Sequence, residues 1–253
     1  MSEAGTFLTL KKLADNPLTY QEDFGELDFI LSVHRACDSY ALCENFVLGH
    51  RQLLSVNDVD LGPIDTSWFS SSCVYLLIVR RAGLDEILGG AKLVVYDNNG
   101  NLPLLKLLTD DYPELVGYLN EYSEKGLVEI SGLWNPRSVA GLGLGSEQLI
   151  RTSIAICGLL DIATVVTFCS PFVTRFAELY GFTPLSKFGA NGSIPFPDNR
   201  WMSTINILSD PHVMSKADVV EKKIIFDLRE KPAQTRKFNS RGKEITIKFE
   251  LEL

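Results

Sequence analysis

The 253-residue chain is 45% hydrophobic and 22% charged, with a formal net charge of −8. This composition is ordinary for a globular protein with a normal core, and the only basic stretch lies near the C-terminus, which argues against a nucleic-acid partner. The longest apolar run, 154–168, is interrupted by Asp161 and is too short to cross a bilayer.

No N-terminal stretch has the order of a signal peptide. The five cysteines lack paired spacing and sit in apolar surroundings. This cysteine pattern predicts reduced thiols in a cytoplasmic protein. The short apolar run described above predicts that the protein has no membrane span.

Residues 1 to about 65 are predicted to be helical, because apolar residues recur there at a broken helical spacing. These residues are Leu27, Ile30, Leu31, Cys37, Tyr40 and Ala41. Two strand-like segments, 73–80 and 87–96, then form a hairpin-like pair, and a helical insert is predicted at 111–125.

A strand at 127–134 precedes a glycine-rich loop, and apolar spacing predicts a helix from Ser146 to about residue 160. The β-branched segment 162–169 is typical of a buried strand. Ser170 and Pro171 form a helix start, and Gly181 is a natural stop.

The last strand of this region is predicted at 200–208, which gives one domain over residues 1–210. The tail, 211–253, holds a short helix candidate near 214–222 and two alternating segments, 223–228 and 244–253. We interpret these segments as a hairpin added to the sheet or to a partner, so an oligomer through the C-terminal hairpin is an expectation.

The loop consists of Ala140, Gly141, Leu142, Gly143, Leu144, Gly145 and Ser146. Glycines allow a phosphate to approach the backbone, and the first turn of a helix has free N–H groups. A P-loop needs a Lys and a Ser or Thr after the last glycine, which Ser146-Glu147 does not supply.

Three interpretations of the loop remain. The spacing G-x-G-x-G differs from the dinucleotide motif, and Asp161 opens the next strand where that motif has an acid at its end. A pyrophosphate or phosphopantetheine arm is the second interpretation, and a plain strand-to-helix turn is the third.

The order of strand, glycine loop, helix, strand, helix and Gly181-Phe182 resembles the GNAT acyltransferase superfamily over about residues 73–208. Ala140-x-x-Gly143-x-Gly145 occupies the six positions of its [QR]-x-x-G-x-[GA] pyrophosphate motif. The resemblance implies an α/β (α+β) fold whose mixed, mostly antiparallel sheet is splayed at its centre and flanked by helices. It also implies that backbone N–H groups near Leu133 and Trp134 face a thioester carbonyl.

One branch of that superfamily is more similar. The segment 129–133, Glu-Ile-Ser-Gly-Leu, resembles the Glu-x-Ser-Arg-Phe stretch of acyl-homoserine-lactone synthases and N-acyl amino acid synthases. The segment 89–93 resembles their Gly-Gly-x-Arg-Leu strand, with Lys92 in place of Arg. Other departures are Gly132 for Arg, Ala140 for Gln or Arg, and Ala177 where many coenzyme A users have a Tyr.

Glu129 is the candidate general base, and Ser131 shares its strand face. The plainer interpretations are a solvent-facing or ion-paired Glu129 and a Ser131 that bonds a neighbouring strand. Lys92, Phe168 and Cys169 are predicted substrate contacts. Trp134 and Phe168 either line an acyl tunnel or pack in the core, and Cys169, near a helix start, is a less favoured nucleophile.

The three histidines lack metal-ligand spacing, so no metal is expected. The first hypothesis is an N-acyltransferase that uses an acyl-coenzyme A or acyl-phosphopantetheine thioester as co-substrate, with no permanently bound cofactor. Its partners would be a small-molecule amine acceptor, such as an amino acid derivative, and an acyl carrier protein. The second is a catalytically weak relative that binds an acyl or pantetheine ligand as a sensor or partner-binding module.

Overall fold

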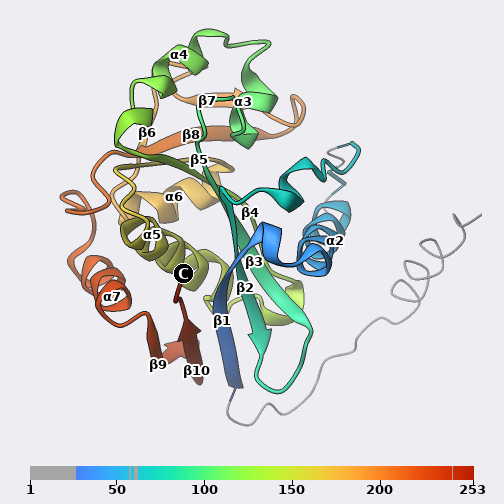
Figure 1. Cartoon of the computed structure of the whole chain (residues 1–253), viewed down its shortest axis with the longest axis vertical. Helices are drawn as coiled ribbons and strands as arrows, with labels where there is room; N and C mark the ends of the chain where they lie inside the picture. The colour runs from blue at the N-terminus through green and yellow to red at the C-terminus, as the bar shows by residue number, and fades with distance from the viewer. Residues whose placement is uncertain (1–26, 57, 60–61, 241) are drawn as a thin grey trace, which may run out of the picture.

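The computed structural model describes residues 27–56, 58–59, 62–240 and 242–253. These residues form one ten-stranded sheet in the order β6-β8-β5-β4-β3-β2-β1-β10-β9, with β7 paired to β8 (Figure 1). The strands are β1 (Leu27–Arg35), β2 (Val74–Arg81), β3 (Ile87–Val95), β4 (Leu127–Trp134), β5 (Thr164–Cys169), β6 (Thr183–Pro184), β7 (Ser193–Pro195), β8 (Met202–Leu208), β9 (Ala233–Ser240) and β10 (Lys243–Glu250). Only the pairs β4–β5 and β1–β10 are parallel, which confirms the mixed, mostly antiparallel sheet.

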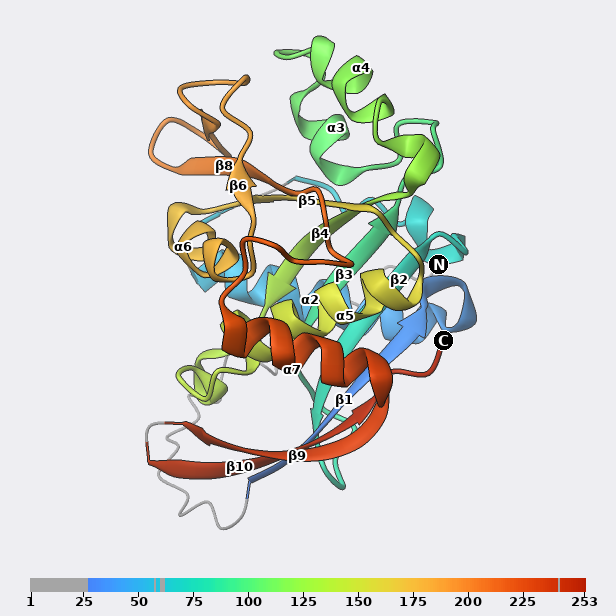
Figure 2. The same ribbon diagram turned by 90° about the vertical axis from the view of Figure 1, so that its left-hand side faces the viewer.

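Helices cover both faces of the sheet. They are α2 (Tyr40–Val56), α3 (Pro103–Leu108), α4 (Glu114–Asn120), α5 (Ile150–Leu159), α6 (Pro171–Leu179) and α7 (Val219–Glu230). Short helical turns lie at η1 (Ala36–Asp38), η2 (Ser67–Ser70), η3 (Ser123–Lys125), η4 (Arg137–Val139) and the π-helical η5 (Leu144–Leu149). Figure 2 shows α5 and α7 side by side in front of the sheet, with α2 behind it.

The central strand β2 explains why the core has two halves. Its first six residues are all buried, as expected for a strand covered on both faces. Leu77 and Val79 pack with α5, α6 and α7, whereas Leu76 and Ile78 pack with α2, α3 and α4. The two faces of the sheet therefore present separate surfaces to a ligand.

The helical prediction for the N-terminal region is wrong over β1. Phe29, Leu31 and Val33 alternate on one face of a strand that pairs with β2 and β10. The apolar spacing in this segment resembles that of a helix because β1 has apolar neighbours on both faces, so adjacent positions are both apolar. The helix α2 confirms the prediction further along, while residues 1–26, 57 and 60–61 lie outside the described part of the chain.

The predicted tail is displaced along the sequence. Helix α7 begins after Asp218, whose carboxylate caps it, and runs through 223–228, so the strand predicted there is wrong. The first hairpin strand is instead β9, and β10 joins the sheet in parallel beside β1. The domain boundary near residue 210 and an oligomer through this hairpin stay predictions.

The middle of the chain follows the predicted order. Strands β2, β3, β4, β5 and β8 begin and end within two residues of their predicted bounds. The predicted insert contains α4 and η3, and α3 precedes it. Gly181 ends α6 with φ +90°, and the N–H of Phe182 donates to Ala177 O.

Candidate active site

The sheet opens between β4 and β5. Their paired register runs from Leu127–Thr164 to Ile130–Thr167, although β4 continues to Trp134 and β5 to Cys169. On its other side, β4 bulges: between the pairs Gly90–Trp134 and Lys92–Ser131, β3 has one residue and β4 has two. Gly132 lies in this bulge with φ +56°, which favours glycine. The backbone around Leu133 therefore departs from regular pairing at the place where the strands separate.

The glycine loop leads from this opening into α5. Gly143 has φ +76°, and its carbonyl accepts the N–H groups of Glu147 and Gln148 at 3.0 Å each. The N–H groups of residues 144–146 thus precede the first helical hydrogen bonds and have no acceptor within the helix. The π-helical η5 then passes directly into α5. This arrangement has the geometry of an anion site.

Neighbouring segments hold the predicted loop residues. Leu144 is buried, Leu142 packs against the core and Ala140 is exposed. A β-carbon on Gly145 would collide with Asn135 Oδ1, so only glycine fits there without movement. Ser240 Oγ of β9 donates to Gly141 O at 2.9 Å. This hydrogen bond links the C-terminal hairpin to the loop.

Three predicted residues share the face of the sheet covered by α2. Lys92 is paired with Ser131, and Val94 with Glu129, so the side chains of Lys92, Glu129 and Ser131 point the same way. Glu129 is only 2% exposed, and its Oε2 accepts the N–H of Leu104 at 2.9 Å. Burial raises the pKa of Glu129 to about 8, against the opposing effects of that hydrogen bond and of Lys92.

Lys92 is half-buried beside this carboxylate. Its ammonium lies 4.6 Å from the centroid of the Trp68 ring. Burial lowers the pKa of Lys92, while the charge of Glu129 raises it. The pKa values of the carboxyl group and of the amino group are thus both shifted toward neutral pH, which suits proton transfer.

Two buried polar atoms near this cluster have no hydrogen-bond partner among the described residues. They are Ser131 Oγ and Trp134 Nε1. Buried donors of this kind are rare in folded proteins and are usually satisfied by water or by a ligand. They give the cluster unused capacity to bind a polar substrate.

His50 of α2 belongs to the same region and was not predicted. Burial, followed by the charge of Lys92, lowers its pKa to about 4, so the imidazole is neutral at pH 7. Its Cε1 lies 3.9 Å from the position that a β-carbon on Gly132 would have. Its place at the bulge depends on how α2 packs, for which the local sequence carries no signal.

The remaining predicted contacts are divided between the two faces. Phe168 lies on the Glu129 face and packs against Phe196 with ring centroids 5.3 Å apart. Cys169 lies on the α6 face, where Asn206 Nδ2 approaches its Sγ at 3.4 Å. Burial raises the pKa of Cys169, which disfavours a thiolate nucleophile. The indole of Trp134 packs on Phe46 and directly over Gly49, as a core residue does.

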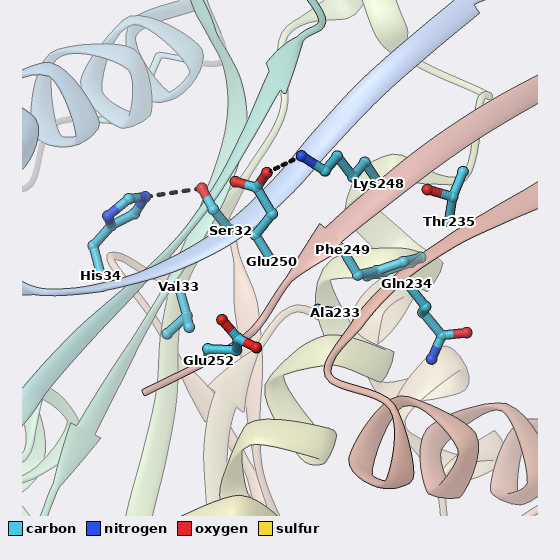
Figure 3. Close-up of a pocket in the computed structure, with 10 residues that line it drawn as sticks. All are labelled: Ser32, Val33, His34, Ala233, Gln234, Thr235, Lys248, Phe249, Glu250 and Glu252. Carbon is cyan, nitrogen blue, oxygen red and sulfur yellow. Dashed lines mark hydrogen bonds and ion pairs between the residues drawn. The ribbon is translucent and has the colours of Figure 1, made fainter.

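A separate pocket of about 550 Å³ lies where β1 meets the hairpin (Figure 3). It contains a Ser32 Oγ–His34 Nε2 hydrogen bond of 2.8 Å and a Lys248–Glu250 ion pair of 2.6 Å. None of the predicted site residues lines it. In the described part of the chain, no cluster of three or more His, Cys, Asp or Glu side chains could hold a metal ion. No described helix has the length and apolarity needed to cross a membrane.

No protein-family model and no curated protein matches the sequence. Solved structures do match its fold. The N-acyl amino acid synthase FeeM from uncultured soil microbes aligns with a TM-score of 0.56 at 13% identity, over 77% of this chain and 97% of that one. The chain has a GNAT fold.

Two further structures support this assignment. The CoA-dependent acyl-homoserine lactone synthase BjaI aligns with a TM-score of 0.51 at 14% identity, over 81% of this chain and 90% of BjaI. Escherichia coli ElaA aligns with a TM-score of 0.50 at 11% identity, over 70% of this chain and 98% of ElaA. The GNAT fold predicted from the glycine loop and the strands around it is confirmed.

Proposed function

We propose that this protein transfers an acyl group from an acyl-coenzyme A or acyl-carrier-protein thioester to the amine of a small acceptor, such as an amino acid derivative. One observation carries the proposal. Where β4 and β5 separate, the glycine loop lies at one end of the opening, and the buried Glu129 and the half-buried Ser131 and Lys92 lie on one face of the adjoining strands. Such an arrangement provides a place for a phosphate-bearing thioester and a base for an amine in the same opening.

The steps follow from the chemistry of these groups. The loop N–H groups hold the donor phosphate, and backbone N–H groups near Leu133 and Trp134 stabilise the thioester oxygen as it becomes an oxyanion. Glu129, as the carboxylate, accepts a proton from the amine, directly or through water. The amine nitrogen bonds to the carbonyl carbon, the carbon–sulfur bond breaks, and the thiolate leaves.

The thiolate takes its proton from solvent in this proposal. Ala177 is buried in α6 at the position where many coenzyme A users have a tyrosine. Tyr180 is 1% exposed and packs in the core on the α5 side. Neither residue offers an acid to the sulfur, so departure of the thiolate depends on water reaching it.

The names of two structural neighbours favour this class of acceptor and donor. FeeM is described as an N-acyl amino acid synthase and BjaI as a CoA-dependent acyl-homoserine lactone synthase. A cytoplasmic location is part of the proposal, since all five cysteines are free thiols. Fractionation that finds the protein outside the cytoplasm would contradict that location.

The test is release of free thiol from acyl thioesters in the presence of a panel of amino acids and their derivatives. Acyl chains of increasing length should be presented both on coenzyme A and on a carrier protein. We expect thiol release that depends on the amine, together with an N-acyl product identified by mass spectrometry. Absence of amine-dependent release across the panel would reject the transferase.

A second candidate is a protein that binds the thioester without turning it over. It is favoured by Ala140, which offers no side-chain contact to phosphates, and by the burial that raises the pKa of Glu129. The same assay separates the two functions when it is combined with calorimetry. Binding of the donor without product would support the sensor or partner-binding module.

A further inference from the structure

The glycine loop has an acidic side chain beside it. The carboxyl atoms of Glu147 lie 3.2–3.4 Å from the position that a β-carbon on Gly143 would have. Gly143 is the residue whose carbonyl begins the helical hydrogen bonding, so the carboxylate lies at the positive end of the helix. A negative charge is stabilised there, and that is also where the proposed donor would bring its phosphate.

A cation lies one turn further along the same helix. Arg151 Nη1 is 3.3 Å from Glu147 Oε2. The other side of its guanidinium forms a bidentate pair with Glu221 of α7, with Nε and Nη2 each 2.6 Å from a carboxylate oxygen. The Arg151 side chain is 8% exposed, Glu221 14% and Glu147 44%. Arg151 is therefore fixed in position, whereas Glu147 has room to move.

The charges of this group do not favour a second anion. Glu147 and Glu221 contribute two negative charges against the single positive charge of Arg151. A phosphate entering the loop meets a net negative charge unless the Glu147 carboxylate turns away. If it does, the phosphate takes over both the helix N–H groups and the Arg151 Nη1 group that Glu147 releases.

We propose that Glu147 is an internal competitor for the phosphate site of the glycine loop, and that the donor must displace its carboxylate in order to bind. The residue thereby sets how strongly the loop discriminates among donors of different charge. This inference rests on the proposed function, because it concerns the same donor site.

The test compares wild type with Glu147→Gln by calorimetry against four probes of falling phosphate charge: coenzyme A, dephospho-coenzyme A, 4′-phosphopantetheine and pantetheine. We expect Glu147→Gln to bind the three phosphate-bearing probes about three- to tenfold more tightly. Pantetheine, which has no phosphate, should bind both proteins equally. Added salt should reduce the difference, because it screens a partly exposed charge.

The melting temperature without donor is a second readout, because it reports whether the Glu147 carboxylate stabilises the helix terminus when no phosphate is bound. In the absence of donor, Glu147→Gln should lower Tm by about 1–3 °C, since the helix loses a favourable charge at its first turn. The control is Glu114→Gln, which removes an exposed first-turn acid from α4. That variant should show a similar loss of stability and unchanged binding of all four probes.

Each outcome decides the matter. Unchanged or weaker binding of the phosphate probes by a folded Glu147→Gln protein would overturn the proposal. An equal gain for pantetheine would also overturn it, because the effect would then not depend on phosphate. If neither protein binds any probe, the proposed donor site itself fails. Binding by Glu147→Gln alone would support the competition in its strongest form.

Discussion

Glu129 combines two properties that usually exclude each other. It is almost fully buried, which disfavours the carboxylate, yet one backbone N–H and the nearby Lys92 ammonium favour that form. Burial dominates and raises its pKa to about 8. The raised pKa favours the protonated form near neutral pH in the absence of substrate, and the carboxylate is a stronger base than that of an exposed glutamate.

We predict that Glu129→Gln lowers kcat by about 10²-fold, the usual range for loss of a general base, with little change in donor binding. The wild-type rate should rise with pH through about 8, as the carboxylate forms, and the variant should lose this dependence. Steady-state kinetics from pH 6 to 9.5 measure both effects. Glu124→Gln, at an exposed site in η3, is the matched control. Wild-type turnover by Glu129→Gln at every pH would mean that the residue has no role as base.

The same carboxyl group links stability to pH. Between about pH 4.5 and 8 the unfolded chain has lost this proton while the folded protein retains it. Stability must then fall as pH rises through this window, because the folded state binds more protons. We predict that wild type loses stability relative to Glu129→Gln over this range and that the difference is constant above about pH 8. Denaturant unfolding at several pH values measures it, and parallel curves would contradict the raised pKa.

Part of this site was predictable from the sequence because strand geometry is local. Alternation places Glu129 and Ser131 on one face of β4, and their spacing alone predicts it. The N–H of Leu104, the ring of Trp68 and the imidazole of His50 come from α3, η2 and α2. Their positions follow from how these helices pack on the sheet, which the local pattern does not determine.

At the scale of elements, the connection between β4 and α5 depends on the close approach of one side chain to a glycine of the loop. Asn135 follows β4 directly, and its side chain occupies the space beside Gly145. The loop keeps its N–H groups in one orientation because the chain on each side is fixed. The Gly143 carbonyl begins the helix, and Ser240 holds Gly141 from the hairpin.

We predict that Gly145→Ala weakens binding of coenzyme A about tenfold, since the added methyl group must displace the Asn135 side chain or shift the loop. The double variant Gly145→Ala, Asn135→Ala should recover most of the affinity, because it removes the obstructing group. Gly117→Ala in α4, where a β-carbon meets nothing within 4 Å, is the control and should bind normally. Calorimetry on folded proteins measures all three. A double variant as weak as the single one would contradict the steric account.

At the scale of the whole molecule, the first and last described strands lie side by side. The pairing of β1 with β10 joins residues more than 200 positions apart in parallel, and α7 packs on α5 on one face of the sheet (Figures 1 and 2). A contact this distant leaves no trace in a local window. Local spacing therefore predicts a helix over β1 and a connecting stretch over the polar β9, and both predictions are wrong. The order of strand, glycine loop and helix, which the local pattern carries, is predicted correctly.

The C-terminal segment completes the core beneath the glycine loop. Ile225 and Leu228 of α7 and three residues of β10 are fully buried with the α5 side of the sheet. Glu221 neutralises the nearly buried Arg151, and removing one partner of such a pair leaves an uncompensated charge. The segment therefore does more than extend the sheet, because the helix that carries the loop depends on it.

We therefore predict that removal of residues 211–253 prevents cooperative folding, since it exposes the edge of β1 and the α7-facing side of α5. Because a truncated chain that fails to fold says little about the cause, a point variant accompanies it. Leu228→Ala, at a fully buried position, should cost about 2–4 kcal/mol in the free energy of unfolding. Val220→Ala, on the exposed side of the same helix, should cost close to nothing. Circular dichroism melting and denaturant titration measure these effects. A truncated protein that melts cooperatively at the wild-type Tm, or a Leu228→Ala protein as stable as Val220→Ala, would mean that the preceding residues form a complete core without the tail.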